Sequence, residues 1–96
     1  MNALDARLRD LQRRFLARSA GDLTQLKAGL QSGDLQALRP LVHRLSGAAG
    51  TFGHHELSRV AGEADDALIE QRSDSRAVLE ALLQCLQATL ATPQPD

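Results

Sequence analysis

His43 is followed at helical spacing by two glycines, Gly47 and Gly50, in a segment that otherwise has the apolar pattern of an amphipathic helix. At about 100° per residue, the apolar side chains of this segment share one side of the helix, and His43 shares the opposite side with both glycines. Each interior glycine costs a helix roughly 1 kcal/mol relative to alanine. The pattern therefore predicts an exposed imidazole beside a helix surface that is kept bare at a cost in stability.

An exposed imidazole of this kind is a candidate nucleophile. Its unperturbed pKa of about 6.5 leaves most of it neutral at pH 7, with a nitrogen lone pair that can attack phosphorus. The product would be a phosphoramidate, which can pass its phosphoryl group on. The residues themselves leave a second interpretation open, in which His43 is an ordinary surface histidine.

The spacing of the other candidate groups disfavours a metal site and a hydrolytic site. His54 and His55 are adjacent, so on a helix their side chains would point about 100° apart and could not both face one ion. Ser46 lies three residues after His43, but no group is evident that would orient the imidazole for acyl transfer. We therefore expect no metal ligands and no acyl-transfer chemistry.

The elements that position His43 are all predicted to be helices. Leu4, Leu8, Leu11 and Phe15 have helical spacing, and the positions between them are rich in arginine. The arginines of this first helix are Arg7, Arg9, Arg13, Arg14 and Arg18. They form either a docking surface for an acidic partner or a solvated helix face. The apolar spacing continues past Gly21, so this segment is either two helices or one bent helix.

Three further helices are expected after a break at Gly33, which closes one helix while Asp34 caps the next. The helix that begins near Asp34 or Leu35 contains Pro40 and His43 and stops at Gly53. The next has an apolar face with small residues: Leu57, Val60, Ala61, Ala64 and Leu68. Its acidic residues are expected outside that face: Glu63, Asp65, Asp66 and Glu70. The last helix places these residues inward: Val78, Leu79, Leu82, Leu83, Leu86 and Leu90.

Short connections between amphipathic helices predict an all-α, antiparallel up-and-down four-helix bundle with an extra or bent N-terminal helix. At 96 residues the chain is expected to form one domain over residues 1–91, with a flexible tail over 92–96. Two aromatic residues and a net charge of -1 disfavour nucleic-acid binding. The lone Cys85 and the absence of an apolar run of about 18 residues favour a cytoplasmic protein without a membrane span.

The segment from Val42 to Gly53 reads Val-His-Arg-Leu-Ser-Gly-Ala-Ala-Gly-Thr-Phe-Gly and resembles the signature of histidine-containing phosphotransfer (HPt) domains. The resemblance covers nearly the whole chain. It implies a four-helix bundle in which His43 is phosphorylated and Gly47 permits access to it. It also implies that the partners are receiver domains and hybrid histidine kinases, and that the chain is a carrier and not an enzyme. Mg²⁺ is then expected only in the receiver domain, with no cofactor in this chain, which we expect to be a monomer.

One position departs from the family pattern. Many HPt domains have a lysine three residues after the histidine, and this chain has Ser46, whose hydroxyl can donate a hydrogen bond but carries no charge. Arg39, at about 40° from His43 on the helix, is the best-placed substitute cation, and Gly50 is expected to extend the gap beside His43. The departure keeps an alternative function open, an unphosphorylated module that regulates a kinase or receiver domain. Partner docking is expected at Arg44, Leu35 and His54.

Overall fold

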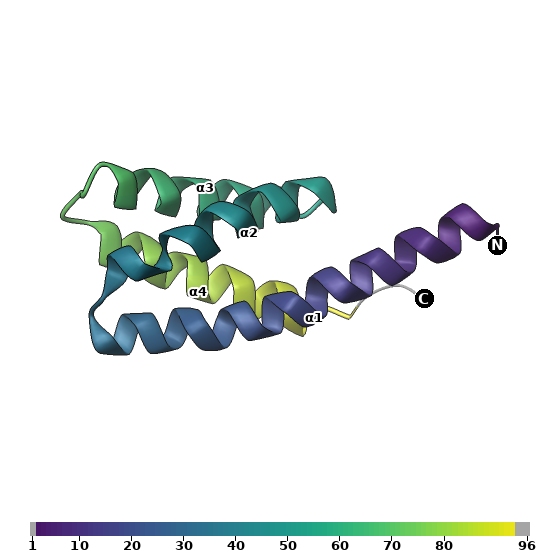
Figure 1. The fold of residues 1–96 in the computed structure, drawn as a ribbon, viewed down its shortest axis with the longest axis horizontal. Helices are drawn as coiled ribbons and strands as arrows, with labels where there is room; N and C mark the ends of the chain where they lie inside the picture. The colour runs from purple at the N-terminus through teal and green to yellow at the C-terminus, as the bar shows by residue number, and fades with distance from the viewer. Residues whose placement is uncertain (1, 94–96) are drawn as a thin grey trace.

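Four long helices follow one another in alternating directions in the computed structural model, which describes residues 2–93 (Figure 1). They are α1 (Ala3–Ser32), α2 (Arg39–Thr51), α3 (His55–Ile69) and α4 (Ser75–Ala91), and a short 3₁₀ helix, η1 (Leu35–Leu38), precedes α2. This arrangement confirms the predicted all-α antiparallel bundle. The predicted flexible tail falls largely on residues 94–96, which lie outside the described residues.

Helix α1 runs without interruption for 30 residues. Gly33 ends it with a φ of 82°, a left-handed conformation that glycine adopts without strain. Neither a helix break nor a separate extra helix occurs at Gly21, because this residue is exposed and the buried face continues beyond it through Leu26 and Leu30. The predicted N-terminal segment is therefore a single helix. Its later turns pack in the bundle, and its first turns extend past the other helices.

The start of α2 differs from the prediction. Because α2 begins at Arg39, Pro40 lies in its first turn, where backbone N–H groups have no acceptor within the helix, so its missing N–H costs no bond of α2. Asp34 makes no side-chain capping bond to η1, so its predicted capping role is wrong. Gly53, with a φ of 81°, closes the turn after α2 as predicted. His43 consequently stands on the second turn of a short, well-defined helix.

The core is built mainly from leucine and alanine. Helix α2 packs on α3, α3 on α4, and α4 on α1. The largest fully buried side chains are Leu26, Leu45, Leu57, Leu68, Leu79, Leu82, Leu86, Val42 and Ser19. Leu4 and Leu8, which belong to the apolar pattern of the first predicted helix, are exposed, because the start of α1 extends past the ends of the other described helices (Figure 1).

Candidate functional site

His43 projects from α2 with 80% of its side chain exposed, and it is held at one point by a buried carboxylate of α3. The Nδ1 atom of His43 lies 2.9 Å from Oδ2 of Asp65. A carboxylate only accepts hydrogen bonds, so Nδ1 carries the proton and donates it to Asp65. In the neutral imidazole the lone pair then resides on Nε2, the nitrogen that faces away from the carboxylate.

Asp65 was predicted to lie outside the apolar face of its helix, and that prediction is wrong. Only 11% of its side chain is exposed. Its second oxygen, Oδ1, is buried and has no hydrogen-bond partner within the described part of the chain. Sequence analysis therefore missed the group that orients His43. The available signal was weak: Asp65 falls about 40° from Ala61 on the helix, at the edge of the apolar arc.

Small residues bring α2 and α3 close enough for this contact. A Cβ added to Gly62 of α3 would lie 3.3 Å from Oγ of Ser46, and one added to Gly50 of α2 would lie 3.1 Å from Oγ of Ser58. These contacts and the His43–Asp65 bond follow one another along one antiparallel interface. Because the aspartate side chain is short, it reaches the imidazole only where the two helix backbones approach closely.

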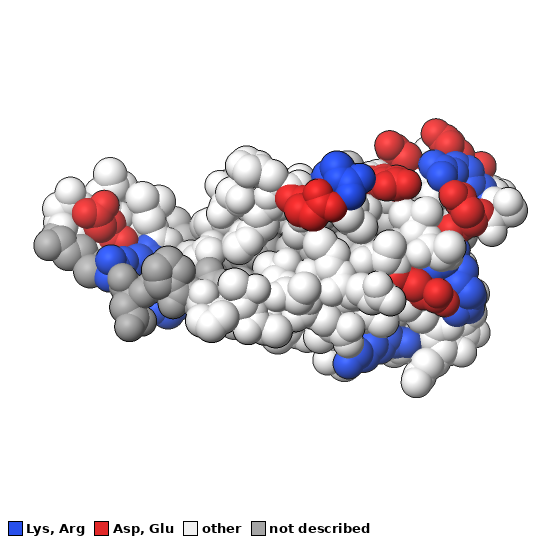
Figure 2. Space-filling model, turned by 180° about the vertical axis from the view of Figure 1, so that it is seen from behind, with Lys and Arg blue, Asp and Glu red and all other residues white. Residues whose placement is uncertain are grey.

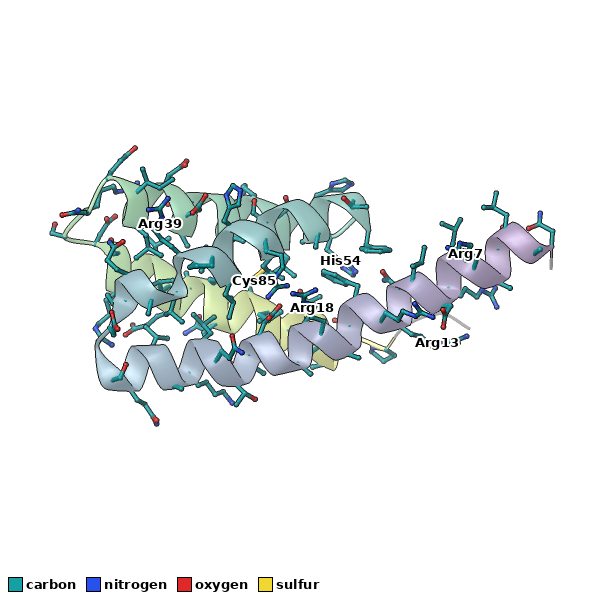
Figure 3. All side chains as sticks on the ribbon, viewed as in Figure 1. Arg7, Arg13, Arg18, Arg39, His54 and Cys85 are labelled. Atoms are coloured by element: carbon teal, nitrogen blue, oxygen red, sulfur yellow. The ribbon has the colours of Figure 1, made fainter. Side chains whose placement is uncertain are left out.

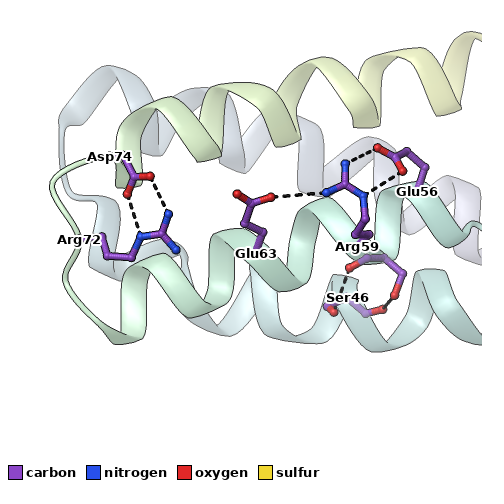
Figure 4. Close-up of polar contacts among 7 residues, drawn as sticks. Ser46, Glu56, Arg59, Glu63, Arg72 and Asp74 are labelled. Atoms are coloured by element: carbon purple, nitrogen blue, oxygen red, sulfur yellow. Dashed lines mark hydrogen bonds and ion pairs between the residues drawn. The ribbon is translucent and has the colours of Figure 1, made fainter.

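Ser46 takes part in this interface and directs its hydroxyl toward α3. Its Oγ donates to the backbone carbonyl of Ser58 at 3.3 Å, and Oγ of Ser58 donates to the carbonyl of Ser46 at 2.8 Å (Figure 4). The position that holds lysine in many HPt domains is thus occupied here by a small side chain bonded across to the neighbouring helix. Gly50, expected beside His43 as open space, lies against Ser58 of α3.

Gly47 and Arg39 lie on the open side of the site. Apart from its chain neighbours and the backbone of α2, no described atom comes within 4 Å of a Cβ added to Gly47, so the surface one turn beyond His43 is bare. Arg39 lines a shallow depression of about 360 Å³ together with Gln36, Pro40 and His43. Helical side chains lean toward the helix N-terminus, so a group attached to His43 would extend toward Arg39. Arg39 forms no ion pair with any described residue.

The three residues expected to dock a partner are engaged within the bundle. Arg44 makes two hydrogen bonds to Asp22 of α1, at 2.6 and 3.2 Å, and Asp22 is only 5% exposed. Leu35 is half-buried against the core. His54 stacks on Phe15 with ring centroids 5.2 Å apart, and Figure 3 shows it at the end of α2 that faces α1. None of these three contacts involves His43.

Neither a metal-binding cluster nor a membrane-spanning helix occurs in the part of the chain that the structure describes. Across residues 2–93, no cluster of three or more histidine, cysteine, aspartate or glutamate side chains could hold a metal ion. The same residues contain no helix that is both long and apolar enough to cross a membrane.

Comparison with known proteins identifies the family. The family model that describes the Hpt domain matches residues 10–92 of the sequence, which is nearly the whole chain. No curated protein and no solved structure matches this chain. Hpt domains are phosphotransfer carriers rather than catalysts, and they interact with receiver domains and kinases. The matched residues contain the whole helical core and the exposed, carboxylate-bound histidine, and the chain therefore belongs to the Hpt domain family of His–Asp phosphorelays.

Proposed function

We propose that this chain carries a phosphoryl group on Nε2 of His43, to and from the aspartates of receiver domains. The observation that carries the proposal is the state of the imidazole. It is largely exposed, yet its Nδ1 is bonded to a buried carboxylate, so the free lone pair is on the accessible nitrogen. A histidine with both nitrogens in solvent would distribute its proton between them and would be less well oriented.

The proposed transfer balances as a displacement at phosphorus. The lone pair of Nε2 forms the new N–P bond while the P–O bond to the receiver's aspartate breaks, and that carboxylate leaves with the electron pair. The proton stays on Nδ1, so positive charge develops on the ring beside the carboxylate of Asp65. Charge-assisted hydrogen bonds are roughly twice as strong as neutral ones, so Asp65 stabilises the phosphorylated ring more than the free ring.

The remaining roles follow from position. Gly47 leaves room for the partner's loops beside His43, and Arg39 supplies the positive charge that Ser46 lacks. The receiver domain supplies Mg²⁺ and the other catalytic groups, so this chain requires no cofactor of its own. A hybrid histidine kinase is the proposed source of the phosphoryl group, in a cytoplasmic relay in which this chain acts as a monomer.

The test is labelling by a receiver domain that carries phosphate on its aspartate. We expect the full chain to acquire an acid-labile, alkali-stable phosphoryl group and His43→Gln to acquire none, with the same helical circular dichroism. The matched control is His55→Gln, the same change at another exposed histidine, which should be labelled like wild type. Labelling retained in His43→Gln would overturn the assignment. Equal regulation of a kinase by wild type and His43→Gln, without labelling of either, would establish the interaction module instead.

A further inference from the structure

The first turns of α1, residues 3–11, extend past the other helices, and we call this segment the α1 arm (Figures 1 and 3). Leu4 and Leu8 in the arm are 63% and 52% exposed, the largest exposed fractions among the leucines of the described chain. The Hpt match begins at residue 10, so nearly all of the arm precedes the matched region. The arm is thus an apolar surface that neither the bundle nor the family domain accounts for.

The apolar side chains of α1 form a narrow seam. Leu4, Leu8, Leu11 and Phe15 are separated by four, three and four residues, the alternation of the inner positions of a coiled coil. At Phe15 the seam is buried by the bundle, whereas at Leu4 and Leu8 it is uncovered. A stripe this narrow fits one facing helix, and it is narrower than the broad apolar face of a helix that lies in a membrane surface.

A row of arginines flanks one side of this seam. At about 100° per residue, Arg7, Arg14 and Arg18 fall within 90° of its centre, all on the same side. Residues 3–18 contain five arginines and two aspartates, whereas residues 19–96 contain six basic and ten acidic residues. Beyond α1 the arginines of the bundle are largely paired with acidic side chains, as over α3 in Figure 2. Arg7 and Arg18 form no ion pair with a described residue.

The seam leads into a hollow at the base of the arm. The hollow has a volume of about 240 Å³ and lies between α1 and α2. Leu11, Arg14 and Arg18 line its α1 side, and Ala48 and Phe52 are among the residues of its α2 side. The arginine row and the hollow are therefore on the same flank, so that a helix laid along the arm would end against the bundle.

The positive charge beside the seam favours an acidic partner helix over a second copy of this chain. A second copy of the arm laid antiparallel would place Arg7 and Arg14 of one copy beside the same residues of the other, and like charges at such positions destabilise a helix pair. An acidic partner would instead form ion pairs with Arg7 and Arg18, and with Arg14 in place of or beside its pair with Asp10 at 3.0 Å. We propose that the α1 arm is a docking helix for an acidic protein helix with a heptad apolar seam, on a surface separate from His43.

The test is binding of a designed probe to the full chain, measured by fluorescence anisotropy. The probe is a three-heptad helical peptide with leucine at its a and d positions and glutamate at its e and g positions. We expect saturable binding that weakens at least about tenfold in Leu4→Gln/Leu8→Gln, because burying each leucine is worth more than about 1.4 kcal/mol. Arg7→Glu/Arg14→Glu should weaken binding similarly.

The matched control is Arg9→Glu/Arg13→Glu, which makes the same change in net charge on the opposite side of α1. It should retain binding within about threefold. An equal loss in both arginine variants would show attraction by net charge alone and overturn the proposal, as would no binding of the probe by wild type. The proposal would also be overturned by a monomer–dimer equilibrium that Leu4→Gln/Leu8→Gln abolishes, or by tighter binding to vesicles of phosphatidylcholine and phosphatidylserine than to the probe.

Discussion

Nδ1 of His43 on α2 lies 2.9 Å from Oδ2 of Asp65 on α3, and this hydrogen bond joins an exposed imidazole to a buried carboxylate. In Asp65→Asn the amide keeps the size of the side chain but loses the charge that opposes positive charge on the phosphorylated ring. We expect the rate of phosphoryl transfer to His43 to fall about tenfold. This corresponds to a loss of about 1.4 kcal/mol of transition-state stabilisation when the hydrogen bond is no longer assisted by charge. Quench-flow transfer from a phosphorylated receiver domain measures this rate.

Asp66→Asn is the control for that experiment, because it makes the same chemical change at an exposed neighbour on α3. Its transfer rate should stay within about twofold of wild type. If both variants slowed transfer equally, the effect would come from the net charge of α3, and the hydrogen bond to His43 would have no special role.

Gly47 lies one turn beyond His43 on a surface where an added Cβ meets nothing. Gly47→Gln should leave the bundle folded and raise its free energy of unfolding by up to about 1 kcal/mol, because glutamine is the better helix former. Transfer from the receiver domain should nevertheless slow, since the new side chain occupies the space beside the imidazole. Urea unfolding and transfer kinetics on the same sample separate the two effects.

Gly21→Gln provides the comparison, since Gly21 is also helical and a Cβ added to it would also meet no described atom outside its own helix within 4 Å. It should give the same gain in stability without any loss of transfer. Transfer at the wild-type rate in Gly47→Gln would mean that Gly47 has no part in access to His43.

The sequence was sufficient to predict the bundle because most of the apolar positions repeat at helical spacing, and those positions form most of the core. It failed where the outcome depended on the ends of helices. The seam of Leu4 and Leu8 continues that of Leu26 and Leu30, and the periodicity is the same whether or not another helix lies alongside. How far α1 extends past its neighbours depends on the lengths of the other helices and on their registers.

The candidate site was predicted only in part for a related reason. His43 and Gly47 belong to one helix, so their relation follows from 3.6 residues per turn. Asp65 is 22 residues away, and its contact with His43 depends on the register between α2 and α3. That register is fixed by Ser46, Gly50, Ser58 and Gly62, which show no periodic signal because they are small and not apolar. In the sequence, Ser46 was notable only as the position where the family's lysine is missing. In the structure its hydroxyl bonds to the carbonyl of Ser58, so it acts as a packing residue between α2 and α3.

Arg44 and Asp22 form a largely buried ion pair that links α2 to α1. Arg44→Met should lower the free energy of unfolding by about 3 kcal/mol, because it leaves the Asp22 carboxylate buried without its partner. Arg44→Met/Asp22→Leu should recover most of that loss, since no buried charge then remains. Chemical unfolding of the two variants and of Asp22→Leu completes the cycle.

Arg59→Met is the matched control for this pair. Arg59 also makes two hydrogen bonds to a carboxylate, that of Glu56, but both side chains are more than 60% exposed (Figure 4). Arg59→Met should lower the free energy of unfolding by no more than about 1 kcal/mol. Equal losses in Arg44→Met and Arg59→Met would contradict the structural role of Arg44.

Cys85 gives the bundle a pH-dependent contribution to stability on the alkaline side. Burial, with a smaller effect from the charge of Glu56, raises the pKa of its thiol. The contribution is fully present below the pKa of the unfolded thiol, about 8.5, and is lost as pH rises through the higher pKa of the folded state. Between about pH 7 and pH 10, the free energy of unfolding should therefore fall more steeply in wild type than in Cys85→Ala. Because other titrating groups are common to both proteins, the difference between the two slopes isolates the thiol, and parallel slopes would contradict its burial.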